Sequence, residues 1–215
     1  MILCYITDRT QFSGSEPARR KRLLQKIAEA ARAGVDYIQL REKDLSGHDL
    51  EELAREAMRI LLAPRPSPLA PRLLINSRTD VALAAGAHGV HLRSDDLSPR
   101  DVRRLCTLAS RHSPRAARPF LVGVSCHTVD EVARAAAARA CFVIFGPVFE
   151  KDGVAAPRGL DRLRRAGHER VPVLALGGVT LENARLCRDA GARGIAAIRL
   201  FQQNDIADVV RRLKM

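Results

Sequence analysis

The strongest constraint on the fold is an alternation, repeated eight times, between short apolar runs and longer amphipathic stretches. Apolar runs that lack internal polar alternation, each followed by a helical pattern, are typical of a parallel sheet covered by helices. Eight such units are the number that closes a (β/α)8 barrel. The sequence therefore predicts an α/β protein in which residues 1–215 form a single TIM barrel domain.

The predicted strands and helices alternate along the whole chain. The expected strands are Ile2–Thr7, Tyr37–Leu40, Leu73–Asn76, Gly89–Leu92, Phe120–Ser125, Cys141–Phe145, Val173–Leu176 and Gly194–Ile198. The expected helices are Pro17–Ala33, Gly47–Leu62, Thr79–Ala85, Ser98–Ala109, Thr128–Arg139, Gly159–Ala166, Leu181–Ala190 and Asn204–Leu213. Helix-end signals agree with these bounds. Gly34, Gly86 and Gly191 follow Ala-rich ends, as C-terminal caps do, and Thr128 with Glu131 predicts a capping box.

The composition fits one globular protein with a substantial core, because 47% of the residues are hydrophobic. The Pro-rich stretch Ala63–Pro71 is interpreted as a loop on the amino-terminal face of the barrel, not as a linker between domains. A net charge of +12 would suit nucleic-acid binding, but the arginines are spread through nearly every predicted helix. With no Trp and two Tyr there is also little surface for base stacking, so no nucleic acid partner is expected.

The sequence contains no apolar run that approaches the roughly 20 residues of a membrane-spanning helix. The segment Met1–Thr10 lacks a basic leader and runs directly into a predicted strand, so a cytoplasmic protein without a membrane partner is expected. Five scattered cysteines without a CxxC pair predict neither a disulfide framework nor a zinc site.

The second predicted strand ends in a cationic segment, Tyr37–Asp44, with the sequence YIQLREKD. Gln39, Arg41 and Lys43 alternate there, and strand ends build the active face of such a barrel. Two cations and an amide aimed at one place suggest a phosphate or diphosphate ligand. The alternative is that the two cations form ordinary ion pairs with acidic residues of the same segment or of neighbouring loops.

Polar residues also follow other predicted strands. They are Asn76 and Ser77, Arg93 to Asp96, Ser125 to Thr128, Gly177 and Gly178, and Arg199. Paired glycines before a helix allow a backbone to approach a phosphate. Asp95 and Asp96 are candidate Mg²⁺ ligands, or else a cap of the following helix.

His127 has two interpretations. It is either a general acid or base, since histidine titrates near neutral pH, or a hydrogen-bonded residue of the helix start. Cys126 is a less favoured nucleophile because adjacent side chains diverge. His88 and His91 flank the fourth strand and are interpreted as structural histidines with satisfied hydrogen bonds.

Taken together in this order, several phrases resemble the thiamine phosphate synthase family and its relatives, the TenI-type thiazole tautomerases. They are IQLREKD, LLINSRTDVALAAGAHGVHLRSDDL, GVSCHT, FGPVF, PVLALGGVTLENA and GIAAI. The resemblance covers nearly the whole chain and implies a (β/α)8 barrel. It also implies a synthase that joins hydroxymethylpyrimidine diphosphate to a thiazole phosphate (carboxylate) and releases pyrophosphate with the assistance of Mg²⁺.

The resemblance also assigns roles to individual positions. Gln39 would hold the pyrimidine with Ser125 nearby, and Arg41 and Lys43 would hold the diphosphate with Asn76 on the same side. The remaining positions are Asp96 for Mg²⁺, and Gly178, Ile198 and Arg199 for the thiazole phosphate. In the tautomerases a histidine at the position of His127 is the proposed proton shuttle.

Three positions depart from the family's pattern. Ser77 stands where the synthases usually have an acidic metal ligand, which reduces the expected Mg²⁺ ligand set. The usual Thr-x-Thr-Lys loop is absent, so that Lys151 and Arg158 are the cations near it, and Arg199 replaces a small hydroxyl residue. The expected activity is that of the synthase, a transferase. The alternatives are a thiazole tautomerase, an isomerase, and a non-catalytic barrel that binds thiamine precursors. Relatives commonly pair through outer helices, which admits a homodimer that the sequence itself does not decide.

Overall fold

A computed structural model describes residues 1–62, 71–110, 119–149 and 157–214 of the chain. Its strands are β1 (Ile2–Ile6), β2 (Tyr37–Leu40), β3 (Arg72–Asn76), β4 (Gly89–Leu92), β5 (Leu121–Cys126), β6 (Phe142–Phe145), β7 (Val173–Ala175) and β8 (Gly194–Ala197). Its helices are η1 (Arg9–Gln11), α1 (Glu16–Ala33), α2 (Gly47–Leu62), α3 (Thr79–Ala84), α4 (Pro99–Ser110), α5 (Val129–Ala137), α6 (Pro157–Ala166), α7 (Ala184–Asp189), α8 (Arg199–Gln202) and α9 (Ile206–Lys214). The predicted Pro-rich loop, except for its last residue, lies outside the described residues.

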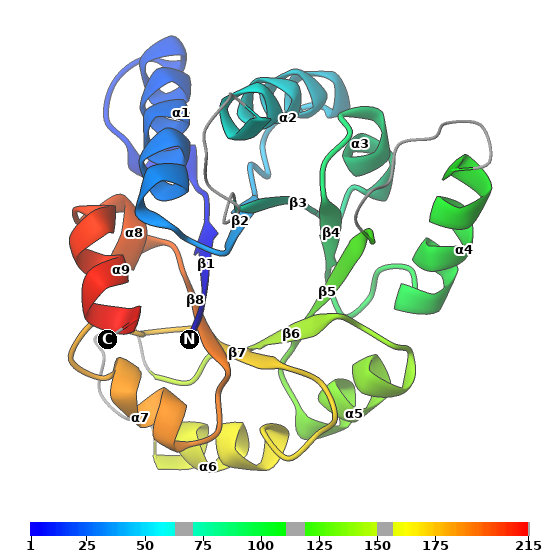
Figure 1. Ribbon diagram of the computed structural model, residues 1–215, viewed down its shortest axis with the longest axis vertical. Helices are drawn as coiled ribbons and strands as arrows, with labels where there is room; N and C mark the ends of the chain where they lie inside the picture. Colours follow the sequence, from blue (N-terminus) through cyan, green and yellow to red (C-terminus); the bar gives the residue numbers. More distant parts are fainter. Residues whose placement is uncertain (63–70, 111–118, 150–156, 215) are drawn as a thin grey trace.

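The strands form a closed barrel in which each pairs with the next in sequence and β8 pairs with β1, all in parallel. Figure 1 shows the barrel in the centre with the helices in a ring around it. The predicted single (β/α)8 barrel is therefore confirmed. Within the described ranges, no helix is long and apolar enough to cross a membrane.

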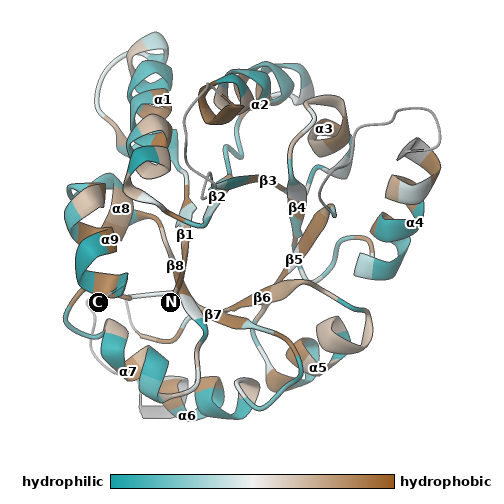
Figure 2. Cartoon of the chain, viewed as in Figure 1, coloured by the Kyte–Doolittle hydropathy of each residue, from teal (hydrophilic) through white to brown (hydrophobic). Residues whose placement is uncertain are grey.

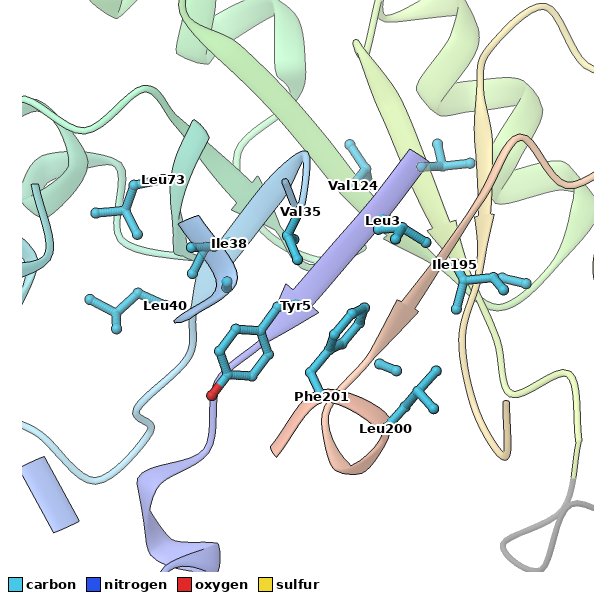
Figure 3. Packing of buried hydrophobic residues seen from close by; sticks show 14 of the residues in the cluster. Leu3, Tyr5, Val35, Ile38, Leu40, Leu73, Val124, Ile195, Leu200 and Phe201 are labelled. Carbon is cyan, nitrogen blue, oxygen red and sulfur yellow. The ribbon is translucent and has the colours of Figure 1, made fainter. Parts of the chain in front are cut away.

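Two core layers hold the barrel together. The larger layer lies between the strands and the helices, whose outward faces are hydrophilic (Figure 2). Figure 3 shows part of it, where Tyr5 of β1 lies beside Phe201 of α8 with ring centroids 5.7 Å apart. The smaller layer fills the barrel interior with the side chains Cys4, Ile6, Leu74, Phe142, Ile144, Leu174 and Ala196.

The helix-end predictions are confirmed. Gly34, Gly86 and Gly191 have φ values of 86°, 66° and 92°, the left-handed conformation that ends a helix without a Cβ clash. The Thr128 hydroxyl accepts from the Glu131 amide while the Glu131 carboxylate accepts from the Thr128 amide, which is the predicted capping box.

The structure differs from the prediction near the end of the chain. Helix α7 begins at Ala184 instead of Leu181, because the Thr180 amide donates to Asn183 Oδ1 at 2.8 Å and closes a turn first. The short helices η1 and α8 were not predicted, since elements of one turn show no hydrophobic periodicity. Both follow strand ends at the carboxyl face, and both contribute to the site described below.

The barrel interior becomes polar towards this face. A Cβ on Gly123 of β5 would lie 2.4 Å from the Phe142 ring and 2.9 Å from the His91 ring, so both rings occupy the interior beside Gly123. Because strand side chains alternate, residues two positions further along each strand face the same way. Asn76 and Ser125 therefore stand above the apolar layer, at the mouth.

Candidate active site

The acidic and the basic side chains at the carboxyl end of β2 make different contacts. The buried Arg9 guanidinium binds Glu42 Oε2 at 3.1 Å and Asp44 Oδ1 at 2.7 Å. Arg41 is half-buried and Lys43 exposed, and neither forms an ion pair within the described parts of the chain. The acidic residues of the segment are thus bound by Arg9, and both predicted ligand cations keep their charge for another partner.

The pKa shifts reflect these contacts. Hydrogen bonding from Arg9 lowers the pKa of Asp44, so its carboxylate stays ionised. Burial raises the pKa of Glu42, while hydrogen bonds from Thr7 and Arg9 act in the opposite direction. Burial tends to lower the pKa of Arg9, but hydrogen bonds to Asp44, Glu16 and Glu42 outweigh it and raise that pKa.

Gln39 and Asn76 form a direct amide pair between β2 and β3. The Gln39 Nε2 donates to Asn76 Oδ1 at 2.8 Å, and the Asn76 amide in turn lies 3.4 Å from the Ser77 hydroxyl. Gln39 is buried, and among the described residues its Oε1 has no hydrogen-bond partner. Ser77 has φ of 60°, which turns the chain sharply at the end of β3. A buried oxygen such as Gln39 Oε1 is a candidate acceptor for a ligand donor.

The histidine before β4, His88, differs from the histidine within it, His91. The Nδ1 atom of His88 accepts from the Leu73 amide at 3.1 Å, which matches its predicted structural role. The prediction of satisfied hydrogen bonds is wrong for His91: this ring is 1% exposed, and both nitrogens lack a partner within the described part of the structure. Burial lowers the pKa of His91 to about 3, so the ring is neutral. The ring stacks on Phe142 at 6.0 Å instead, an apolar contact that sequence spacing does not reveal.

Strand β5 places its two candidate groups apart. Cys126 is buried on the helix side, and burial raises its pKa to about 12, so it is not a ready nucleophile. His127 is exposed at the start of the loop, and its Nδ1 lies 2.7 Å from the Gly146 carbonyl oxygen. Since a carbonyl oxygen only accepts, Nδ1 carries the proton and Nε2 of the neutral ring is left as the basic nitrogen.

Asp96 stands in the loop after β4 with 15% of its side chain exposed. Its Oδ2 accepts from the Arg93 amide at 2.8 Å, and Asp95 is far more exposed. The described residues contain no cluster of three or more His, Cys, Asp or Glu that could hold a metal. Mg²⁺ commonly takes one or two carboxylates and completes its shell with water and substrate phosphate. Asp96 is one carboxylate of this kind, and its Oδ1 also lies 3.4 Å from Arg93 Nε.

A cavity of about 500 Å³ opens beside the ends of β7 and β8. Its lining includes Gly177, Gly178, Ile198 and the exposed Arg199, which begins α8. Gly177 and Gly178 have φ values of 97° and 62°, which expose backbone amides at the rim. The structure thus brings three of the predicted phosphate-binding residues to one cavity. A larger hollow of about 610 Å³ lies on the outside, against α4, away from the strand ends.

Two predicted positions are not placed. Lys151 lies outside the described residues, as does the side chain of Arg158. Sequence reasoning missed Thr7 and Arg9, although both follow the first predicted strand, the position from which the other candidates were chosen.

The fold and the mouth define a (β/α)8 barrel whose carboxyl face gathers cations, amides and an anion-sized cavity. Residues 3–201 match the family model described as thiamine monophosphate synthase. A relative from Geobacter sulfurreducens, named provisionally as a thiamine-phosphate synthase, is 42% identical, covering 91% of this chain and 84% of its own. Thiamine-phosphate synthase from Albidiferax ferrireducens is 37% identical, covering 80% and 74%.

The solved structure of thiamine phosphate pyrophosphorylase from Pyrococcus furiosus superposes with a TM-score of 0.74 at 25% identity, covering 99% of this chain and 93% of that one. Sequence and structure comparisons thus agree over nearly the whole chain. The protein belongs to the thiamine monophosphate synthase family.

Proposed function

We propose that this protein is a thiamine-phosphate synthase, a transferase of thiamine biosynthesis that joins hydroxymethylpyrimidine diphosphate to a thiazole phosphate. The observation that carries the proposal is the pair of cations, Arg41 and Lys43, which have no ion-pair partner among the described residues and follow the Gln39–Asn76 amide pair at the end of β2. A cationic strand end next to amide groups suits a ligand that joins a diphosphate to a polar heterocycle.

Different residues of the site contact the pyrimidine and the diphosphate of this ligand. The unsatisfied Gln39 Oε1 is suited to accept a hydrogen bond from the pyrimidine, with Ser125 on the neighbouring side of the mouth. Arg41 and Lys43 hold the diphosphate with the help of Asn76. As the diphosphate departs, negative charge builds on its oxygens, and these two cations stabilise it more strongly than they stabilise the bound substrate.

The second substrate fits the cavity at β7 and β8. The amides around Gly178 and Ile198 offer donors to the thiazole phosphate, and Arg199 adds a charged group. This arrangement brings the thiazole nitrogen towards the pyrimidine from the β7 and β8 side of the mouth, so the bond can form as pyrophosphate leaves.

Asp96 would hold Mg²⁺ together with the substrate diphosphate. When bound, the metal supplies additional charge neutralisation to the leaving group. Because Ser77 offers a hydroxyl where a second carboxylate would strengthen the site, we expect weak binding of Mg²⁺ in the absence of substrate.

A thiazole tautomerase is the second candidate, and one observation favours it. The contact with Gly146 leaves His127 Nε2 as the basic nitrogen at an exposed position, as a proton shuttle requires. In that case His127→Asn would abolish isomerisation of the thiazole.

The deciding experiment measures thiamine phosphate formed from the two substrates, with Mg²⁺ present and then chelated. Metal-dependent product is expected for the synthase. Absence of product, with thiazole isomerisation that His127→Asn removes, would make the protein a tautomerase. Ligand binding without any turnover would instead identify a precursor-binding barrel.

A further inference from the structure

The segment after β1 contacts the cationic end of β2 through a dense set of hydrogen bonds. We propose that Arg9 is a positioning residue of the diphosphate site, which holds the carboxylates of Glu42 and Asp44 away from Arg41 and Lys43. This inference rests on the proposed function, since it explains how that function's cations stay available. Arg9 itself touches no substrate.

Arg9 holds the acidic residues of this segment through several hydrogen bonds. Its guanidinium is 3% exposed, and Nη1 and Nη2 bind the two Asp44 oxygens at 2.7 and 2.8 Å. Nη1 also reaches Glu42 at 3.1 Å, and Nε reaches Glu16 at 2.6 Å. A two-pronged contact fixes the direction of a carboxylate as well as its distance. Asp44 is therefore held although 55% of its side chain is exposed.

Hydrogen bonds from Thr7 and from the Arg9 amide extend these contacts to the backbone of the cationic segment. The Thr7 hydroxyl donates to Glu42 Oε1 at 2.5 Å and accepts from the Arg41 amide at 3.0 Å. The Arg9 amide donates to Glu42 Oε2 at 2.9 Å. Both oxygens of the buried Glu42 are thus used on the β1 side. Because the Thr7 hydroxyl binds both Glu42 and the Arg41 amide, the contacts that hold Glu42 also fix the backbone at Arg41, directly before the turn that contains Lys43 and Asp44.

The segment that contains Asp8 and Arg9 is also anchored on the α8 side of the mouth, where the cavity of the second substrate lies. Gln202 of α8 receives the Asp8 amide at 2.8 Å on its Oε1 and donates from Nε2 to the Asp8 carbonyl at 3.0 Å. The Tyr5 hydroxyl reaches the same Oε1 at 3.2 Å. Helix α8 starts at the cavity of the second substrate, so a continuous network joins the two halves of the mouth.

The consequence concerns charge. If Arg9 no longer binds Asp44, the Asp44 carboxylate can pair with Lys43, the preceding residue in the chain. An internal carboxylate that is always present then competes with the diphosphate for the same cation. Loss of Arg9 should therefore weaken binding of the diphosphate through Asp44, and removal of the Asp44 charge should reverse the defect.

The test compares Arg9→Met, Asp44→Asn and the double variant, with Arg188→Met on the exposed side of α7 as control. Inorganic pyrophosphate binding is measured by calorimetry, and KM and kcat are measured with hydroxymethylpyrimidine diphosphate. Arg9→Met is expected to raise both the Kd and the KM about tenfold with a smaller change in kcat. The double variant should recover most of that loss, a rescue that a purely structural role would not give.

Arg9→Met leaves Glu42 buried without its cation, so Arg9→Lys serves as a second variant in case the first does not fold. Lysine keeps a charge for Glu42 but cannot grip both Asp44 oxygens. A smaller increase in Kd, again reversed by Asp44→Asn, is expected. Unchanged pyrophosphate binding in a folded Arg9 variant, or a defect that Asp44→Asn does not reverse, would overturn the proposal.

The two readouts separate this inference from the proposed function. Rescue seen in pyrophosphate binding, in a protein that makes no thiamine phosphate, would support the role of Arg9 and reject the synthase. Normal synthase turnover that is insensitive to Arg9 variants would do the reverse.

Discussion

At the scale of single residues, the barrel interior contains the polar imidazole ring of His91 among apolar side chains. His91 lies against Phe142 with both nitrogens buried and without partners among the described residues. Such a group costs free energy that a buried leucine would not. His91 lies beside Gly123 and in register with Asn76, so this cost falls next to the Gln39–Asn76 pair.

This placement predicts a pH-dependent stability. Burial lowers the pKa of His91 from 6.5 to about 3, so between these values the unfolded chain binds a proton that the folded protein does not. The free energy of unfolding therefore falls as the pH drops below 6.5. At about 1.4 kcal/mol per pH unit, the loss between pH 6.5 and 4.5 is roughly 2 to 3 kcal/mol.

The measurement compares urea unfolding of the wild type and of His91→Leu at pH 7 and pH 4.5. We expect the wild type to lose more stability on acidification than the variant, since all other titrating groups are shared. Equal losses in the two proteins would mean that His91 takes up its proton in the folded state.

At the scale of elements, we propose that the end of β2 carries the function. Arg41 is half-buried and Lys43 is exposed, in contrast to Ile38 and Leu40 of β2, which are fully buried. Changes to the two cations should thus affect ligand binding and not folding.

We expect Lys43→Ala and Arg41→Ala each to reduce turnover of the diphosphate substrate to background, with melting temperatures close to that of the wild type. Lys21→Ala, which removes an exposed charge from α1, is the matched control and should keep full activity. Steady-state kinetics and thermal unfolding together check this. A variant that unfolds while still binding pyrophosphate would place the site elsewhere.

Most of the barrel could be predicted from sequence, because each strand is a short, mainly apolar run and each long helix has a regular apolar face. Capping signals such as Thr128 with Glu131 carry their own chemistry within a few residues. Helix α8 could not be predicted in this way, since four residues show no period.

The site was predictable to a smaller extent. Strand ends identified Arg41 and Lys43, but their availability depends on Arg9, which is 35 positions away from Asp44 in the chain. The sequence alone does not show which of several cations will form an ion pair with a given carboxylate. Likewise, nothing in the local pattern distinguishes the satisfied His88 from the unsatisfied His91, because only the packing of Phe142 decides it.

At the scale of the whole molecule, the net charge of +12 is balanced locally over much of the surface. Ion pairs such as Arg55 with Glu51 at 2.6 Å and Arg164 with Asp161 at 2.7 Å mix both signs on the outer helices. Mixed-sign pairs of this kind weaken the local attraction for a phosphate backbone. By contrast, Arg41 and Lys43 have no ion-pair partner in the part of the chain that the structure describes, and we propose that they bind a small anionic ligand.

This distribution predicts opposite outcomes for two phosphate ligands. Pyrophosphate should bind at about 150 mM salt because Arg41 and Lys43 contact it directly at a partly desolvated mouth, where screening is weak. Mixed-sequence duplex DNA should show no binding at the same salt and about 10 μM protein, since affinity for it would have to come from screened surface charge. Calorimetry for the first ligand and fluorescence anisotropy for the second make the comparison. Tight DNA binding with a steep salt dependence would show that the basic residues of the surface act together in binding a phosphate backbone. The ligand site at the mouth would then no longer account for the positive charge of this protein.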